Sequence, residues 1–293
     1  MVVAQLLDRA VIAKFSCFED NPVVAIERLE AGLSQECYRV QTKKGEFLAK
    51  HFRNNQAFKK ELAVTKRKSS ERIIPELNAF RENWLISEFL QGSMLSELAI
   101  SFEEKLDIAL PLIKRFYSLS HNIEKHTELF GQIDLAHLIK QMAVALSNDL
   151  DKTLLIEQVL NKFESENHLS GYENVLCHGD LNFNNIMYHH SVKDWRLFDF
   201  ESCHLSHIEY DIAMLLAVNE YPITNLDQIR DNLLIPFPQL SLQLVTRYYS
   251  VCLLVNALWY LEQTNKKQPL AIKDKYQKLS AAQFHLLNDA LYS

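Results

Sequence analysis

The 293-residue sequence lacks paired cysteines and an excess of positive charge, and its basic clusters, such as Lys66-Arg67-Lys68, are short. Its five cysteines are scattered and include no Cys-x-x-Cys pair. This argues against a disulfide framework or a four-cysteine zinc site and favours reduced thiols. The formal net charge of -6 gives no general attraction to nucleic acid or to anionic lipid. We therefore expect a cytoplasmic protein without a nucleic-acid partner.

The sequence also lacks recognisable export and membrane signals. Residues 1–15 include Asp8 and Arg9 and have no cationic start followed by a clean apolar run, so a signal peptide is not expected. The longest apolar stretch, Val251–Leu261, contains Asn256 and is shorter than the roughly 20 residues that a membrane span needs. We expect a soluble protein with no membrane association.

The chain changes character near residue 90. Before this point, a helix is expected over Val2–Lys14, alternating strands within residues 23–52, and a helix over Ala57–Lys68. A short apolar strand over Trp84–Leu90 then ends at a Gln-Gly turn. The pattern predicts a small sheet with one helix packed on it.

Most of the chain after residue 90 has apolar residues at helical spacing. The helical stretches are Ser101–Ser118, Leu135–Ala145, Leu154–Phe163 and Leu240–Leu291. The exception is residues 174–200, where two strand-like pieces flank a predicted hairpin tip at His189-His190-Ser191. We predict an α+β protein with a small N-terminal sheet lobe over residues 1–90 and a larger, mainly helical lobe over residues 91–293.

The motif that carries chemistry is His178-Gly179-Asp180, followed by Asn185 and, past the hairpin, by Asp199-Phe200-Glu201. Phosphoryl transfer needs a carboxylate that orients the attacking hydroxyl and oxygen ligands that hold magnesium on the phosphates. A hairpin between the two loops returns the chain to its starting end, so it brings them side by side. The sequence predicts catalytic roles for Asp180, Asn185 and Asp199; a set of turn-forming residues is the plainer alternative.

In order and spacing these residues resemble the aminoglycoside phosphotransferase and choline kinase superfamily, over roughly residues 23–215. The resemblance implies a protein-kinase-like two-lobe fold that uses ATP and Mg2+. It implies that Asp180 is the catalytic base, that Asn185 and Asp199 hold the metal, and that His178 braces the loop. Asp211, in a later Asp-Ile-Ala triplet, is expected to be a structural brace.

Two upstream residues fit the same family. Lys50 closes an alternating strand and Glu61 lies in the following helix, so the resemblance implies that Lys50 pairs with the ATP phosphates and Glu61 holds it. A solvated strand end for Lys50 and a surface ion pair for Glu61 remain alternatives. Further nucleotide-binding residues are expected in a glycine-poor phosphate loop and in the hinge: Gly32, Ser34, Gln35 and Glu88.

Trp259 and Tyr260 are similar to a stretch in choline and ethanolamine kinases whose rings line a pocket for a quaternary ammonium. Core packing is the alternative interpretation of these rings. With Glu201 they are the expected substrate residues. The segment Cys203–His207 has no second ligand pair for zinc and is expected to be a loop.

The predicted function is ATP-dependent phosphorylation of a hydroxyl on a small molecule, most simply a choline- or thiamine-like alcohol. The predicted division of labour is nucleotide binding by residues 1–90, and catalysis with substrate binding by residues 91–293. The alternatives are an aminoglycoside O-phosphotransferase and a non-catalytic ATP-binding module. A metal-dependent phosphohydrolase would require further His/Asp clusters that the sequence does not display.

Overall fold

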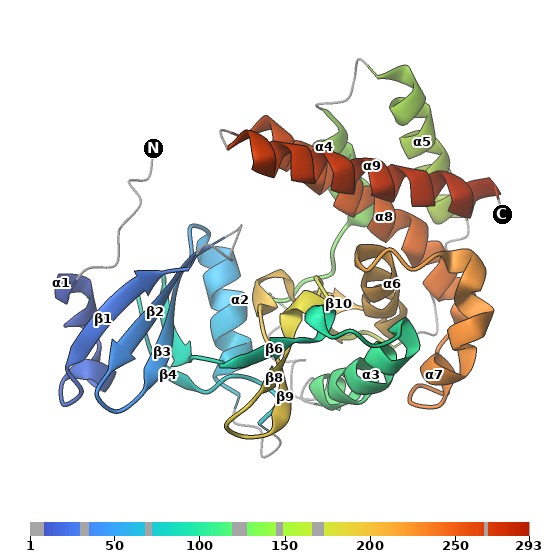
Figure 1. Cartoon of the computed structure of the whole chain (residues 1–293). Helices are drawn as coiled ribbons and strands as arrows, with labels where there is room; N and C mark the ends of the chain where they lie inside the picture. Colours follow the sequence, from blue (N-terminus) through green and yellow to red (C-terminus); the bar gives the residue numbers. More distant parts are fainter. Residues whose placement is uncertain are drawn as a thin grey trace. The chain divides into compact units, whose positions relative to one another are not determined.

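The computed structural model describes residues 9–29, 35–67, 72–118, 128–144, 149–165, 173–266 and 269–292 (Figure 1). The chain forms two compact units. The first comprises Met1–Ala99 and Asn184–Ser202, and the second comprises Ile100–Phe183 and Cys203–Ser293. Strands dominate the first unit and helices the second, which is the α+β organisation that the sequence predicts.

The first unit is built on a five-stranded antiparallel sheet with the strand order β1-β2-β3-β5-β4. Its strands are β1 (Val23–Arg28), β2 (Glu36–Thr42), β3 (Glu46–His51), β4 (Leu77–Arg81) and β5 (Trp84–Glu88). The alternating segments of the sequence became β2 and β3 and the short apolar segment became β5, whereas β4 was not expected. Within the register, Cys37 of β2 and Leu85 of β5 flank Lys50 of β3.

Helices cover both faces of this sheet. On one face, α1 (Arg9–Ile12) and the short 3₁₀ helix Ser16–Phe18 pack against a core that includes Tyr38 and Trp84. Of the helix expected over Val2–Lys14, residues 1–8 lie outside the described part. On the other face, Phe58 of α2 (Asn55–Thr65) packs on Phe52 and Leu85. Because side chains alternate along a strand, Lys50 lies on the α2 face of β3.

A second, three-stranded sheet completes the first unit, in the order β6-β8-β9. It joins β6 (Gly92–Met94) to the hairpin strands β8 (Ile186–His189) and β9 (Asp194–Leu197). The backbone N–H of Leu197 donates to Ile73 O at 2.8 Å, and the 3₁₀ helix Phe200–Ser202 packs against α2. These contacts place the hairpin in the first unit, although the sequence analysis counted it with the helical lobe.

Two local expectations about this region were wrong. His189 was assigned to the hairpin tip, but it is the last residue of β8, 5% exposed, and its Nε2 lies 3.1 Å from Glu88 Oε1. The segment Cys203–His207 was expected to be a loop, but it contains strand β10 (His204–Ser206), which pairs with β7 (Val175–Cys177). In both cases the strand pairs with one that is distant in sequence: β8 with β6, and β10 with β7. Local composition does not predict such pairing.

The second unit contains the helix α6 (Ile208–Val218), in which residues 208–217 are buried. The remaining helices are α3 (Phe102–Ser118), α4 (Leu135–Ala143), α5 (Leu150–Ser165), α7 (Arg230–Leu234), α8 (Leu242–Asn265) and α9 (Leu270–Tyr292), with a 3₁₀ helix over Ile223–Ile229. α8 packs against both α6 and α9.

Among the described residues, α8 is the one helix long and apolar enough to cross a membrane by length and composition alone. Of its apolar window, 61% is buried inside the structure. A core helix passes the same test, and the contacts of α8 with α6 and α9 make it a core helix here.

Candidate active site

The first unit gathers three carboxylates around the ammonium group of Lys50. Lys50 Nζ lies 2.5 Å from Asp199 Oδ1, 3.5 Å from Glu61 Oε2 and 3.5 Å from Glu201 Oε2. The side chains of Lys50 and Glu61 are only 8% and 7% exposed. Neither the solvated strand end nor the surface ion pair, the plainer interpretations of these two residues, describes this geometry.

Burial and charge act against each other at this cluster. Burial lowers the pKa of Lys50, but Asp199, Glu61 and Glu201 raise it, and the result is a pKa well above the ordinary value. Burial raises the pKa of Glu61 to about 7, Lys50 opposes that rise, and the charges of Asp199 and Glu201 add to it. Three carboxylates around one ammonium leave an excess of negative charge, which favours a cation nearby.

Asn185 and Asp199 lie at matching ends of the β8–β9 hairpin. The register pairs Ile186 with Leu197, and one step beyond it Phe198 N donates to Asn185 O at 3.1 Å. Asp199 itself has a φ of 72°, in the left-handed region that non-glycine residues rarely adopt. The hairpin therefore holds the backbones of the two expected magnesium ligands next to each other, as the sequence predicts.

The donor set at this hairpin fits Mg2+. Mg2+ prefers oxygen ligands and is bound through one or two carboxylates together with substrate phosphates. The carboxylate of Asp199 and the side-chain amide of Asn185, which is 7% exposed, are donors of this kind. The excess of carboxylates over cations around Lys50 favours a divalent cation further.

In the second unit, Asp211 of α6 braces the loop that carries Asp180. The backbone N–H groups of His178 and Gly179 donate to the carboxylate of Asp211 at 2.7 and 3.0 Å, and the hydroxyl of Tyr117 donates at 3.1 Å. Asp211 is 0% exposed. Gly179 has a φ of 83°, a conformation that glycine adopts without a side-chain penalty.

Asp180 follows these braced residues and is half-buried. Asn182 donates to the Asp180 backbone carbonyl at 3.1 Å and to its Oδ1 at 3.4 Å. Sequence reasoning identified Asp211 as a brace but missed Tyr117 and Asn182. Asn182 could have been found from the sequence, because Asn side chains often hydrogen-bond to the backbone of residues close to them in the chain.

Three aromatic rings cluster where α8 meets α9. Trp259 and Tyr260 have ring centres 5.5 Å apart, and the ring of Tyr276 lies 5.8 Å from Trp259 and 6.0 Å from Tyr260. Burial raises the pKa of Tyr260 to about 12, and the charge of Asp180 contributes to that rise. Tyr276 was missed because nothing in the sequence pairs it with Trp259.

The other expected nucleotide-binding residues have mixed outcomes. Gly32 and Ser34 lie outside the described residues. Gln35 Oε1 accepts the backbone N–H of Arg53 at 3.1 Å, which ties the start of β2 to the end of β3. The backbone N–H of Glu88 donates to Glu76 O at 2.8 Å. Of the two backbone groups of Glu88, the carbonyl is therefore the one expected to contact adenine.

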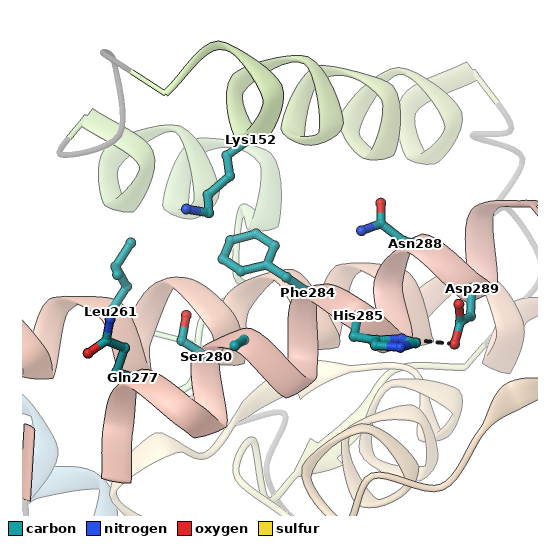
Figure 2. Close-up of a pocket in the computed structure, with 9 residues that line it drawn as sticks. Lys152, Leu261, Gln277, Ser280, Phe284, His285, Asn288 and Asp289 are labelled. Atoms are coloured by element: carbon teal, nitrogen blue, oxygen red, sulfur yellow. Dashed lines mark ion pairs between the residues drawn. The ribbon is translucent and has the colours of Figure 1, made fainter. Parts of the chain in front are cut away.

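A cavity of about 540 Å³ lies between α5 and α9 (Figure 2). Lys152 projects toward it from α5, while Phe284 and the ion-paired His285 and Asp289 come from α9. None of the residues predicted from the sequence lines it. One lining residue, Leu261, directly follows the predicted substrate residue Tyr260 in the sequence.

Comparison with solved structures supports the kinase-like fold. An ethanolamine kinase from Plasmodium vivax aligns with a TM-score of 0.66 at 16% identity, covering 90% of this chain and 82% of that one. A choline kinase from Streptococcus pneumoniae aligns with a TM-score of 0.66 at 18% identity, covering 90% and 94%. A thermostable mutant of an aminoglycoside phosphotransferase aligns with a TM-score of 0.64 at 15% identity, covering 91% and 95%.

At the level of sequence, no curated protein matches this chain. Residues 25–235 nevertheless match the phosphotransferase enzyme family. The match includes the strand with Lys50, the braced loop with Asp180, the hairpin ending at Asp199, and the brace Asp211. With most of the chain matched and the fold shared, this protein is a member of the phosphotransferase enzyme family.

Proposed function

We propose that the protein is an ATP- and magnesium-dependent kinase of the cytoplasm that phosphorylates the hydroxyl of a small cationic alcohol of the choline or thiamine type. The observation that carries the proposal is the cluster of Lys50 with Glu61, Asp199 and Glu201. In kinases a strand lysine held by a helix glutamate pairs with the nucleotide phosphates. The first unit supplies that pair, and we assign nucleotide binding to it.

The proposed reaction is an in-line transfer of the γ-phosphoryl group. Asp180 accepts the proton of the substrate hydroxyl while a bond forms between that oxygen and the γ-phosphorus and the bond to ADP breaks. Lys50 donates to the phosphates, and to do so its ammonium group gives up its contact with Asp199. Asp211 acts only by positioning, because its partners are the backbone of His178 and Gly179 and the hydroxyl of Tyr117.

Asn185 and Asp199 would hold Mg2+. The metal, when bound, offsets the negative charge of the phosphates. The positive φ of Asp199 is consistent with a carboxylate held in a fixed position for this purpose. Structures of the choline kinase with AMP and of the aminoglycoside phosphotransferase with ADP and hygromycin B indicate that proteins of this fold bind nucleotides.

The aromatic trio supports a cationic alcohol as substrate. Rings of Trp and Tyr attract ammonium groups through their negative faces. Trp259 and Tyr260 are half-buried and offer such faces, while Tyr276 is 1% exposed and packs beside them. An aminoglycoside is the second candidate, because an aminoglycoside phosphotransferase aligns nearly as well as the choline and ethanolamine kinases.

The test is ATP consumption with Mg2+ against choline, ethanolamine, thiamine and several aminoglycosides, with the product identified by mass spectrometry. Asp180→Asn should lower kcat by about a hundredfold or more, the usual contribution of a positioned general base. The matched control is Asp227→Asn, which makes the same change at a side chain that is 92% exposed. Its kcat should equal that of the wild type.

Substrate class and catalysis can fail separately in this test. Turnover of an aminoglycoside but of no amino alcohol would refute the substrate class and leave the kinase proposal intact. Asp180→Asn with wild-type kcat would refute the catalytic assignment. ATP binding without transfer to any alcohol in the panel would favour a non-catalytic ATP-binding module.

A further inference from the structure

The first unit contains a cavity of about 500 Å³ that the proposed reaction does not use. Its walls come from the end of α2, the segment that leads into β4, β4 itself, and the β8–β9 hairpin. None of Lys50, Asn185 and Asp199 lines it, although the side chain of Glu88 in the expected hinge does. Cavities of roughly 300–1,000 Å³ accommodate small organic ligands.

Arg196 of β9 lines this cavity as a buried cation. Its side chain is 3% exposed, and its Nε has no hydrogen-bond partner among the described residues. Its other contacts are long, at 3.4 Å to Asp194 Oδ2 and 3.2 Å to the Trp195 carbonyl. A desolvated guanidinium with so little compensation is costly, so an anion close to it would lower that cost.

Among the described residues that line the cavity, positive side chains outnumber negative ones. Lys66, Arg67 and Arg72 join Arg196, against Glu76 and Glu88. The two oxygens of Glu88 are already engaged, one at 3.1 Å from His189 Nε2 and the other accepting the Glu76 N–H at 3.3 Å. The balance therefore favours an anionic ligand.

One wall of the same cavity is apolar. Ile74, Pro75, Leu77 and Phe80 line it, and Phe80 is 46% exposed. The ammonium of Lys66 lies 4.0 Å from the centre of the Phe80 ring. A cation next to an exposed ring suits a ligand that combines a negative group with an apolar body.

We propose that this cavity binds a small organic oxyanion, a carboxylate or phosphate monoester attached to an apolar group. The guanidinium of Arg196 and the ammonium of Lys66 would meet the oxyanion, and the apolar group would pack on Phe80 and Leu77. The ligand contacts both α2, which carries Glu61, and the hairpin, which carries Asn185 and Asp199. Its binding stabilises the first unit through mass action.

The experiment is isothermal titration of the full-length protein with phenyl phosphate, benzoate and inorganic phosphate. We expect saturable one-to-one binding of phenyl phosphate or benzoate, and the tighter of the two identifies the oxyanion. Inorganic phosphate lacks the apolar body and should bind at least about tenfold more weakly than phenyl phosphate. Equal affinity of the two phosphates, or no saturable binding of either organic probe, would overturn the proposal.

Variants locate the site. Arg196→Met and Lys66→Gln should each weaken binding about tenfold, as expected for loss of a charge-assisted contact. Lys59→Gln is the matched control, since Lys59 is an exposed lysine of the same helix that does not line the cavity. Lys50→Met should also bind as the wild type does, and loss of binding in that variant would place the probe at the nucleotide phosphates and refute the site. If Arg196→Met does not fold, Lys66→Gln and Arg72→Gln decide the question.

Discussion

The sharpest prediction concerns the brace at Asp211. Asp211→Asn keeps the size of the side chain but replaces one acceptor oxygen by an NH2 group that cannot accept. The remaining oxygen can serve His178 N and Tyr117 OH, which share Oδ2, so the Gly179 N–H loses its partner. The substitution therefore removes one hydrogen bond and turns two charge-assisted bonds into neutral ones.

The size of the effect follows from these three bonds. An unpaired buried donor costs about 1–3 kcal/mol, and a bond to a charged acceptor exceeds a neutral one by about 1 kcal/mol. We expect a loss of about 3 kcal/mol for Asp211→Asn. For a unit of this size that corresponds to a fall in Tm of roughly 6–12 °C. Tyr117→Phe removes one donor and should cost about 1 kcal/mol.

The assay is thermal unfolding followed by circular dichroism, with Asp227→Asn as the surface control. The double variant Tyr117→Phe/Asp211→Asn should lose less than the two single variants combined, because both changes remove the same bond. A Tm for Asp211→Asn equal to that of the wild type would refute the brace. So would strict additivity in the double variant.

Three further predictions follow from the first unit. Lys50→Met should abolish phosphoryl transfer in the ATP assay while far-ultraviolet dichroism stays unchanged, and retained turnover would contradict the role of the lysine. Burial raises the pKa of Glu61 to about 7, so its contribution to folding is largest at low pH and is lost as the pH rises through 7. Glu61→Gln should thus gain stability relative to the wild type between pH 5 and pH 8 in urea unfolding, and a pH-independent difference would contradict this. At Gly92 a Cβ atom would lie 1.7 Å from the Tyr188 carbonyl oxygen, so Gly92→Ala should force β6 from β8 and lower the unfolding midpoint in urea, and an unchanged midpoint would contradict this.

Much of the fold could be read from local sequence pattern. The segments that became β2 and β3 alternate between apolar and polar residues, and the segment that became β5 is short and apolar. β4 was missed, since Leu77–Arg81 is short, follows Pro75, and pairs with β5 through an irregular register between Leu77 and Ala79. The apolar stretch 240–291 was read as helical, but its separation into α8 and α9 was not foreseen.

The candidate site divides in the same way. Asp180, Asn185, Asp199 and Asp211 were recognisable because loop motifs are local in sequence. Contacts between distant segments were harder to foresee. Glu201 was expected at the substrate, yet its carboxylate lies 3.5 Å from Lys50 Nζ, a neighbour about 150 residues away in the chain. Tyr117, Tyr276 and the cavity around Arg196 likewise depend on which elements pack together, which a single sequence does not specify.

The first unit is discontinuous in sequence, and this has a consequence for its biosynthesis. Residues 1–99 leave the ribosome long before residues 184–202, so β6 must wait for its partner β8. Closing the intervening segment of about 80 residues costs roughly 4 kcal/mol of chain entropy. Until then Lys50 lacks Asp199 and Glu201, and the edge of β6 is open to foreign strands. A fragment ending near residue 99 should therefore be prone to aggregation, and the nascent chain is a natural client for chaperones until Ser202 has emerged.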